Sequence, residues 1–143
     1  MVDRVQRGRG LTSRVGYPSS SDEYPHADVT VLEVAAVHEF GAPNANIPMR
    51  SHVRTAYDNN LEALKERAAD AWGHVVDGTS MPELEIARLG EAHANDIKQM
   101  IQQGPFEPLS PETIARKGST VPLIDTAQML QSVTHVEDDR EPV

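Results

Sequence analysis

Histidine and carboxylate side chains are the groups in this sequence whose types and spacing could do chemistry. His93 and Asp96 stand three residues apart, so on a helix they share a face and could bind one metal ion. Two ligands do not complete a site, and no His-Glu-x-x-His spacing supplies a third. His93 also lies on an apolar stripe, where a histidine hydrogen-bonded in a core or interface is the commoner arrangement. The pair therefore marks a metal-dependent enzyme as an alternative function.

Other catalytic signatures are missing from the sequence. The chain has no cysteine, which excludes thiolate metal sites, cysteine nucleophiles and disulfides. His38 and Glu39 are adjacent, so in a helix they point in different directions. The serines at positions 19–21 lack the Gly-x-Ser-x-Gly elbow of a serine hydrolase, and no glycine-rich phosphate loop occurs. We therefore expect no catalytic residue and no cofactor.

Length and charge limit the class of protein. A chain of 143 residues is the size of one domain with a real core. With one Trp, three Tyr and two Phe, that core must be largely aliphatic. A net charge of −9 argues against broad binding to DNA phosphates, because such affinity comes from Lys and Arg. The sequence lacks an apolar run of about 18 residues, which a membrane-spanning helix needs.

The chain divides into three parts. Residues 1–10, rich in Arg and Gly, predict a flexible basic arm. Residues 11–136 predict a single α+β domain, and residues 137–143 an acidic tail. Residues 1–14 hold four Arg and one Asp, a net +3, whereas the tail holds four acids and one Arg, a net −3. Ends of opposite sign are either solvated termini or latches between neighbouring subunits.

Two long amphipathic helices dominate the predicted domain. Apolar residues recur at three- and four-residue steps over residues 59–77, and Gly78 ends this helix. A second stripe follows Ser80, the expected N-cap, and stops at Gly104. A turn of only a few residues joins the two, which predicts an antiparallel hairpin. Trp72, on the apolar face of the first helix, is assigned to the core.

Strands are predicted near both ends of the domain, over residues 11–17, which end at Pro18, and over residues 132–138, where β-branched residues alternate. Three short helices are expected from their start signals, after Thr30, after Ser110 and after Asp125. The first and last of these are capping boxes, with Glu33 and Gln128 as the third helical residue. The predicted fold class is α+β, a small antiparallel sheet packed by a hairpin of two long helices, with short helices and long loops.

Four collinear segments resemble the neck and tail-completion proteins of tailed bacteriophages, which help to join head to tail. They are Val15-Gly-Tyr-Pro18, Glu33-Val-Ala-Ala-Val-His-Glu-Phe-Gly41, Ile47-Pro-Met-Arg50 with Arg54 and Asp58, and Leu109-Ser-Pro-Glu-Thr-Ile-Ala-Arg-Lys-Gly118 with Pro122-Leu-Ile-Asp-Thr126. Together they span about residues 15–136. Two departures stand out: Ser51-His52 replaces the usual Pro-Phe, and Ala127 replaces the usual Gly.

The resemblance implies a structural virion protein and no enzymatic activity. It implies a homo-oligomeric ring of roughly six or twelve copies, between the portal or its adaptor and the tail terminator or tail tube. Such a subunit is made in the cytoplasm of the bacterial host and resides at the neck of the virion. DNA would pass through the ring without sequence-specific binding, past an acidic lumen that repels phosphates. No membrane is involved. A small regulatory binding module, such as a dimer, is a further alternative.

The matching motifs supply the candidate subunit-interface residues. These are Glu39, Phe40, Ile47, Arg50, Arg54, Asp58, Arg116, Lys117 and Asp125. Arg50 and Arg54 follow a proline-containing loop and precede the first long helix, which predicts exposed positions at the rim of the subunit. Arginine is favoured at contacts between subunits because its planar fork pairs well with carboxylates.

Overall fold

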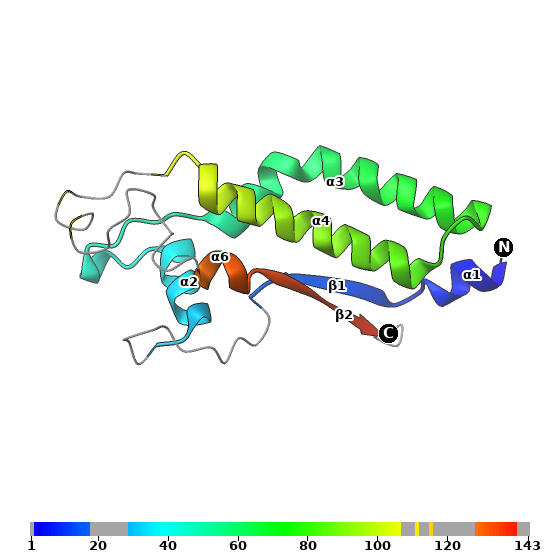
Figure 1. Ribbon diagram of the computed structural model, residues 1–143, viewed down its shortest axis with the longest axis horizontal. Helices are drawn as coiled ribbons and strands as arrows, with labels where there is room; N and C mark the ends of the chain where they lie inside the picture. Colours follow the sequence, from blue (N-terminus) through cyan, green and yellow to red (C-terminus); the bar gives the residue numbers. More distant parts are fainter. Residues whose placement is uncertain (1, 18–28, 107–110, 112–114, 116–127, 140–143) are drawn as a thin grey trace.

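The structure is a computed structural model that describes residues 2–17, 29–106, 111, 115 and 128–139. Its elements in chain order are α1 (Val2–Arg7), β1 (Leu11–Gly16), α2 (Val31–Phe40), a 3-10 turn (Pro43–Ala45), α3 (His52–Asp77), α4 (Pro82–Gln103), α6 (Gln128–Ser132) and β2 (Thr134–Asp139). Figure 1 shows two long helices packed on a small antiparallel sheet, with the shorter helices at the two ends of the molecule. The predicted α+β class is confirmed.

Helices α3 and α4 form the predicted antiparallel hairpin along the long axis of the molecule (Figure 1). α3 ends at Gly78, whose φ of 78° lies in the left-handed region that suits glycine, and the Gly78 N–H donates to carbonyl groups of the preceding turn. The predicted cap of α4 is wrong. Met81, not Ser80, is the N-cap residue, and no side chain caps this end. Pro82 instead occupies the first turn, where its missing N–H costs nothing.

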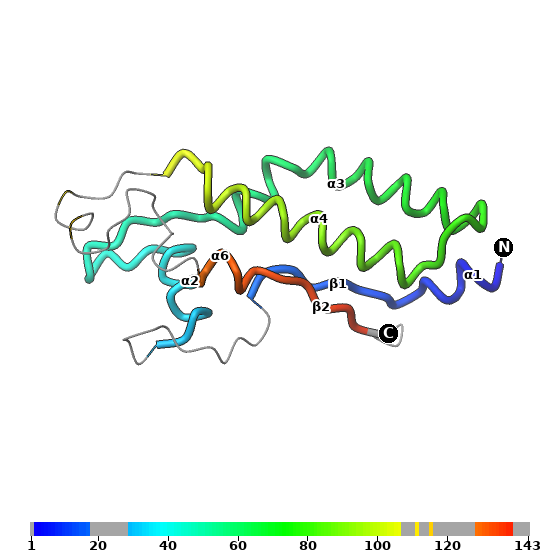
Figure 2. The backbone as a smooth tube through the Cα atoms, viewed as in Figure 1, coloured from blue at the N-terminus to red at the C-terminus, as the bar shows by residue number. Residues whose placement is uncertain are grey.

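The sheet joins the two ends of the domain. β1 and β2 pair antiparallel, with Leu11 opposite Asp139 and Gly16 opposite Thr134; Figure 2 shows the two strands running side by side. Both strands were predicted, and both are confirmed to within about two residues, the usual margin at an element's end. Part of the predicted acidic tail is therefore strand, because β2 runs through Asp139; residues 140–143 lie outside the described residues.

A glycine lets the sheet approach α4 closely. Gly90 is buried, and a Cβ built there would run into the Ser13 hydroxyl and the His135 ring, one from each strand. The absence of a side chain at this position thus sets the spacing between sheet and helix. An ion pair of 2.7 Å between Arg14 and Asp138 bridges the same two strands, although exposed pairs of this kind contribute little.

The predicted N-terminal arm is wrong for most of its length. Residues Val2–Arg7 form helix α1, which lies at the turn end of the hairpin (Figure 1). Arg7 Nη2 meets Glu83 Oε1 at 2.7 Å. The ring of Trp72 lies so close to Gly8 that a Cβ on that glycine would be only 2.8 Å from it. Composition alone suggested an unstructured arm because the contacts that hold α1 come from α3 and α4.

The core is aliphatic, as expected, and sits where α2, α3, α4 and α6 meet. Its buried hydrophobic members are Val31, Ala35, Ala56, Ala94, Ile97, Ile101, Met129 and Val133. The assignment of Trp72 to this core is wrong, since its side chain is 47% exposed. Ala71 and Val75 take the inward positions on that part of α3, so Trp72 is turned to the edge of the helix, where it covers Gly8.

We expect the free energy of unfolding to depend far more on Ile97 than on Trp72. Ile97 is 0% exposed, so Ile97→Ala should cost about 2–5 kcal/mol, the range for emptying a packed core position. Trp72→Ala should cost less than half of that, because much of the ring already faces water. Urea denaturation of both variants measures the difference. A larger loss for Trp72→Ala would show that the ring is a core residue after all.

Candidate functional site

The N-terminus of α3 is capped by a carboxylate from α2. Glu39 is only 9% exposed. Its Oε1 accepts hydrogen bonds from Ser51 Oγ at 2.6 Å and the Arg54 N–H at 3.1 Å, and its Oε2 accepts one from the Val53 N–H at 2.9 Å. The first N–H groups of a helix lack partners within the helix and carry partial positive charge. Glu39 supplies hydrogen-bond acceptors and a negative charge at this end of the helix. Ser51, the N-cap residue, makes no side-chain hydrogen bond of its own to the helix amides.

The sequence between the two helices brings Glu39 to this position. Thr30 and Glu33 start α2 with a capping box in which both reciprocal hydrogen bonds are present, as predicted. After α2 the chain makes a tight excursion, closed by a bridge between Ala42 and Ile47, and returns alongside. The predicted loop over residues 42–48 therefore contains a short 3-10 turn and a backbone bridge. This return places the start of α3 against the end of α2.

Hydrogen bonding decides the ionisation of Glu39. Burial alone would raise the pKa of this carboxyl group. The Ser51 hydroxyl, the Val53 and Arg54 amides and the nearby His52 together outweigh burial, and the pKa is lowered from its ordinary value of 4.5. Glu39 is therefore ionised at neutral pH, and a charged carboxylate makes stronger hydrogen bonds to the helix amides than a neutral one would.

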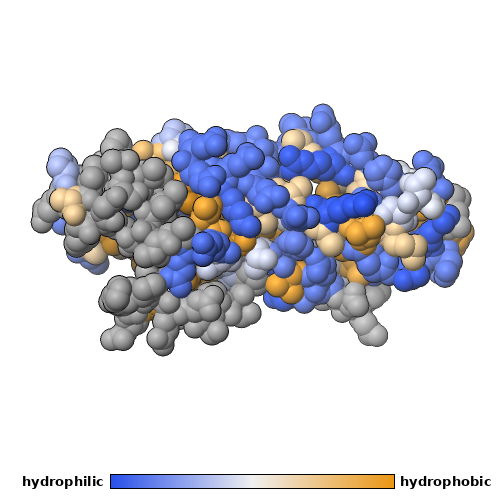
Figure 3. All heavy atoms as spheres, viewed as in Figure 1, coloured by the Kyte–Doolittle hydropathy of each residue, from blue (hydrophilic) through white to orange (hydrophobic). Residues whose placement is uncertain are grey.

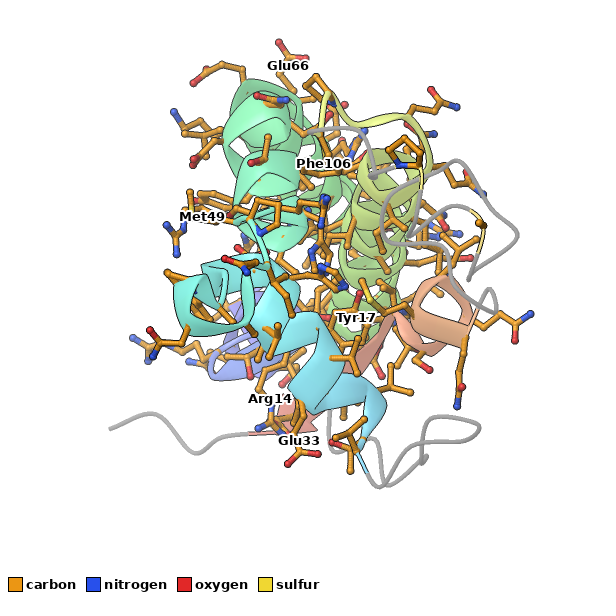
Figure 4. All side chains as sticks on the ribbon, turned by 90° about the vertical axis from the view of Figure 1, so that its left-hand side faces the viewer. Arg14, Tyr17, Glu33, Met49, Glu66 and Phe106 are labelled. Atoms are coloured by element: carbon orange, nitrogen blue, oxygen red, sulfur yellow. The ribbon has the colours of Figure 1, made fainter. Side chains whose placement is uncertain are left out.

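His52, 0% exposed, connects this cap to the sheet. Its Nδ1 lies 3.1 Å from the Arg50 carbonyl oxygen, and its Nε2 lies 2.9 Å from the Tyr17 hydroxyl. A carbonyl can only accept, so Nδ1 carries the proton and Nε2 accepts from the tyrosine. The Glu39 Oε2 lies a further 3.5 Å from Nδ1. Figure 4 shows Tyr17 directed inward among these elements, between α2 and the long helices.

Burial lowers the pKa of His52 from its ordinary value of 6.5, against the Arg50 carbonyl and Glu39, which both raise it. The ring is therefore neutral at pH 7, in agreement with the tautomer that the hydrogen bonds assign. Tyr17, Glu39, Ser51 and His52 form a buried polar unit, which we call the cap cluster. Its members come from the end of α2, the start of α3 and the residue that follows β1, so it joins the ends of three elements at one point.

The structure separates the two arginines that sequence analysis treated alike. Arg50 is 5% exposed, and its backbone N–H donates to the His38 carbonyl at 2.7 Å. The prediction that Arg50 lies at an exposed rim is therefore wrong; the residue is enclosed where the loop joins α3. Arg54 is exposed as predicted, and its guanidinium lies 5.9 Å from the centre of the Phe40 ring, a cation–π contact. Phe40 is itself 67% exposed.

The remaining interface candidates have different surroundings. Ile47 is half-buried and holds the backbone bridge to Ala42, whereas Asp58 is exposed on the first turns of α3. Arg116, Lys117 and Asp125 lie outside the described residues, as does the capping box predicted at Asp125. Of the short helix predicted after Ser110, only Pro111 and Ala115 are described, and both are helical.

An apolar groove of about 510 Å³ opens beside the cap cluster. Among the described residues its lining comprises Val15, Gly16, Tyr17, Leu32, Ala35, Ala36, Glu39, Phe40, Val53, Arg54, Tyr57 and His93. Its volume is in the range of ligand and peptide sites. Leu32, Phe40 and Tyr57 are 43%, 67% and 46% exposed, so the groove presents apolar surface to its surroundings. Arg54 provides a positive charge at its edge.

His93 and Asp96 do not form the ligand pair that their spacing allowed. Asp96 Oδ2 lies 2.8 Å from Arg67 Nη1 and 4.0 Å from His93 Nδ1, so the carboxylate is engaged by the arginine. Burial lowers the pKa of His93; Asp96 opposes this and Arg67 reinforces it. His93 packs edge-on against Tyr57, with ring centres 6.0 Å apart. No group of three or more potential metal ligands occurs in the described part of the chain.

Comparisons of the chain with protein-family models, curated proteins and solved structures give no match. Within the residues that the structure describes, no helix has the length and apolar character needed to cross a membrane.

Sequence analysis identified Glu39 and Arg54 but missed the reasons for their positions. Glu39 was chosen from a motif, and its role as a cap contributed by another helix depends on a contact over 14 and 15 residues of sequence. His52 was noted only as a departure from a motif, although it is one of the largest fully buried side chains. The sequence held one local signal that the cap of α3 comes from elsewhere in the chain. Ser51 precedes a long helix, and no helix residue follows it to complete a capping box.

We expect Glu39→Ala to lower the free energy of unfolding by about 1–3 kcal/mol, because it removes a helix cap and leaves buried N–H donors unpaired. Urea denaturation at pH 7 measures the loss. Glu62→Ala is the matched control, since Glu62 pairs only with Lys65 on the exposed face of α3 and should change stability by under about 0.5 kcal/mol. Equal effects of the two substitutions would contradict the role assigned to Glu39.

We expect stability to fall in two steps as the pH is lowered from 7. His52 has a lowered folded pKa, so below about 6.5 the unfolded state takes up protons more readily and is favoured. Glu39 also has a lowered folded pKa, so its contribution is present above about 4.5 and is lost as the pH falls through the folded pKa. Urea midpoints at a series of pH values test this. His52→Phe should reduce the first step, leaving the share of His93, and Glu39→Gln should reduce the second, leaving the shares of Glu33, Glu83 and Glu85, whose pKa values are also lowered. Unchanged pH profiles would refute the assignment.

Proposed function

We propose that this protein is a neck or tail-completion subunit of a tailed phage or prophage, which forms a ring between head and tail around the DNA channel. One observation carries the proposal: three of the four resembling segments meet in the cap cluster. Tyr17 comes from the first segment and Glu39 from the second; Glu39 accepts from the Arg54 N–H of the third, and Tyr17 and Glu39 contact His52 and Ser51, which lie within the span of the third. Segments that each resemble the same family thus contact one another in the fold, which supports membership of that family.

One of the two departures from the family's pattern falls inside this unit, whereas Ala127 lies outside the described residues. Ser51 and His52 stand where Pro-Phe is usual, and here Ser51 donates to Glu39 while His52 is buried against Tyr17. A phenylalanine would bury an apolar ring at the place where this chain buries a hydrogen-bonded one. The exchange is therefore internal to the subunit. It leaves Phe40 and Arg54 exposed, where a neighbouring subunit could meet them.

The surface charge of α3 supports a channel that DNA passes without binding. Asp58, Glu62, Glu66 and Asp70 follow one another at four-residue steps, and all are exposed. Like charges at this spacing destabilise a helix by a few tenths of a kcal/mol per pair. We call this row the acidic ridge. Figure 4 shows Glu66 directed away from the body of the protein, and Figure 3 shows a mainly hydrophilic face over the long helices. A ridge that lines the lumen would repel phosphates.

The proposal fixes the partners and the place of action. The ring would contact the portal or its adaptor on one side and the tail terminator or tail tube on the other, in the neck of the virion. The alternatives differ in simple measurements. A metal-dependent enzyme would retain a stoichiometric ion, although the engagement of Asp96 by Arg67 gives that alternative no support. A regulatory module would be a stable dimer with no larger assembly.

We expect Arg54→Ala to separate folding from function. An exposed arginine with a cation–π contact contributes roughly 1 kcal/mol or less to the subunit's own stability, so the melting temperature should stay near that of the wild type. At a contact between subunits, losing its charge can cost about 2–5 kcal/mol. In a phage that lacks its own copy, complementation with this variant should leave heads and tails unjoined in electron micrographs.

Arg88→Ala is the control for this experiment, because Arg88 is an exposed arginine on α4 far from the groove that pairs only with nearby Glu85 among the described residues. It should restore normal titre. Infectious particles at normal titre from Arg54→Ala would place Arg54 on a solvated surface. Failure of the wild-type gene itself to complement, with heads and tails both present, would remove the proposed function.

A further inference from the structure

The end of α3 carries apolar surface that the subunit does not use. Trp72 and Val76, one turn apart, are 47% and 42% exposed. Between them lies Gly73, which is exposed, and a Cβ built there would meet no atom within 4 Å. We call these three residues the tip patch. Tryptophan is strongly enriched where proteins bind one another.

Gly73 is the informative member of the tip patch. Glycine inside a helix weakens it relative to alanine, and at this position the subunit has open space for a side chain. Gly90 on α4 has an internal reason to be glycine, since the sheet packs against it. Within the described structure, no packing contact requires glycine at position 73. A residue that breaks a local rule without an internal compensation points to function, and the bare helix surface beside Trp72 would let another chain approach closely.

The groove beside the cap cluster complements the tip patch in both polarity and charge. Its exposed walls are Leu32, Phe40 and Tyr57, and its edge carries Arg54. In the described part of the chain, Arg54 contacts the Phe40 ring and has no carboxylate partner. Asp77, next to Val76, is exposed and has no basic partner among the same residues. The apolar groove is thus flanked by the cation of Arg54, and the apolar tip patch is flanked by the anion of Asp77, so the two surfaces are complementary.

We propose that the tip patch of one copy seats in the groove of the next copy, with Trp72 and Val76 against Phe40 and Arg54 paired with the neighbour's Asp77. The occupant of the groove is a second copy of this chain. The inference deepens the proposed function and rests on it for the closure of a ring. The groove and the tip patch lie at opposite ends of α3 (Figure 1), so one copy can serve two neighbours at once.

The acidic ridge decides how the copies are arranged. Arg54 and Trp72 are 18 residues apart on one helix, about five turns or 27 Å, and so lie on the same side of it. Two copies could in principle pair antiparallel and make the contact twice. At about 100° per residue the acidic ridge turns from about 40° (Asp58) to about 160° (Asp70) away from the side of Arg54 and Trp72, so that arrangement would place both ridges along the same flank of the pair, which is unfavourable. A heterologous contact keeps the ridges apart and continues from copy to copy, closing into a ring or extending as a chain.

Chemical cross-linking tests this arrangement directly. The chain contains no cysteine, so engineered cysteines are its only thiols, and Phe40 and Val76 are exposed enough to be replaced without loss of the fold. The double variant Phe40→Cys/Val76→Cys, treated with a short bis-maleimide, should give a ladder of multimers beyond the dimer on a denaturing gel. Phe40→Cys/Glu91→Cys is the control, since Glu91 is exposed on α4, outside the tip patch, and should give no ladder. A product that stops at the dimer, or equal yields from both variants, overturns the proposal.

Charge reversal tests the pairing of Arg54 with Asp77. In the cross-linkable variant, Arg54→Asp or Asp77→Arg alone should reduce the multimers at least fivefold, and the two together should restore them. Gly73→Ala should raise the melting temperature of the dilute subunit and yet reduce the multimers, because the added methyl group lies in the contact. Single reversals without effect, or no rescue by the double reversal, would contradict the pairing.

The outcomes separate this inference from the proposed function. Rings that form with no cross-link between positions 40 and 76 would exclude the tip-in-groove contact and leave the neck function standing. A ladder from a protein that fails to join heads to tails would exclude the neck function and leave the contact standing.

Discussion

The contact between the Glu39 carboxylate and the first turn of α3 is the constraint on which the rest of the structure depends. A helix of 26 residues has a strong positive end, and nothing in its own first turn satisfies the free amides there. Because the cap comes from α2, the two helices are fixed relative to each other, and the loop between them must return tightly. His52 then connects the same point to Tyr17, the residue that follows β1. The ends of three elements are thereby held together in a protein whose sheet has only two strands.

Burying a polar unit in a small core costs free energy, and this cost is offset because the buried groups are fully hydrogen-bonded. The Glu39 oxygens receive three hydrogen bonds, and both nitrogens of His52 have partners. Satisfied polar groups specify one arrangement more strictly than apolar contacts, which tolerate shifts. The floor of the groove is therefore held rigidly, while Phe40 and Arg54 extend from it into solvent. Rigid support under exposed side chains is what a binding surface needs, because less order has to be gained on association.

Periodicity predicted the parts of this fold that depend on local sequence, and it failed where distant contacts decide. The hairpin, its Gly78 turn, both strands and the Thr30 capping box follow from spacing and capping rules that act over a few residues. The start of α3 at His52 instead of near residue 59, the exposed side of Trp72 and helix α1 depend on partners elsewhere in the chain. Of the candidate interface residues that the motifs supplied, Glu39, Phe40 and Arg54 lie together beside the groove. Sequence analysis placed Arg50 on the surface because its enclosure arises only when the loop folds back onto α2.

The contact proposed between copies is of modest strength, which would suit a subunit that waits for its place in an assembly. An exposed ion pair contributes at most about 1 kcal/mol, and a single aromatic anchor in an open groove adds limited apolar burial. Two dilute copies would therefore associate weakly. In a closed ring every copy is held by two neighbours, so release requires both contacts to break, and a template that gathers the copies raises their effective concentration. The acidic ridges act in the same direction, because their mutual repulsion grows as copies come together and weakens association further. In the proposed ring, weak contacts that are repeated and closed by symmetry would allow free subunits in solution and a stable ring on its template.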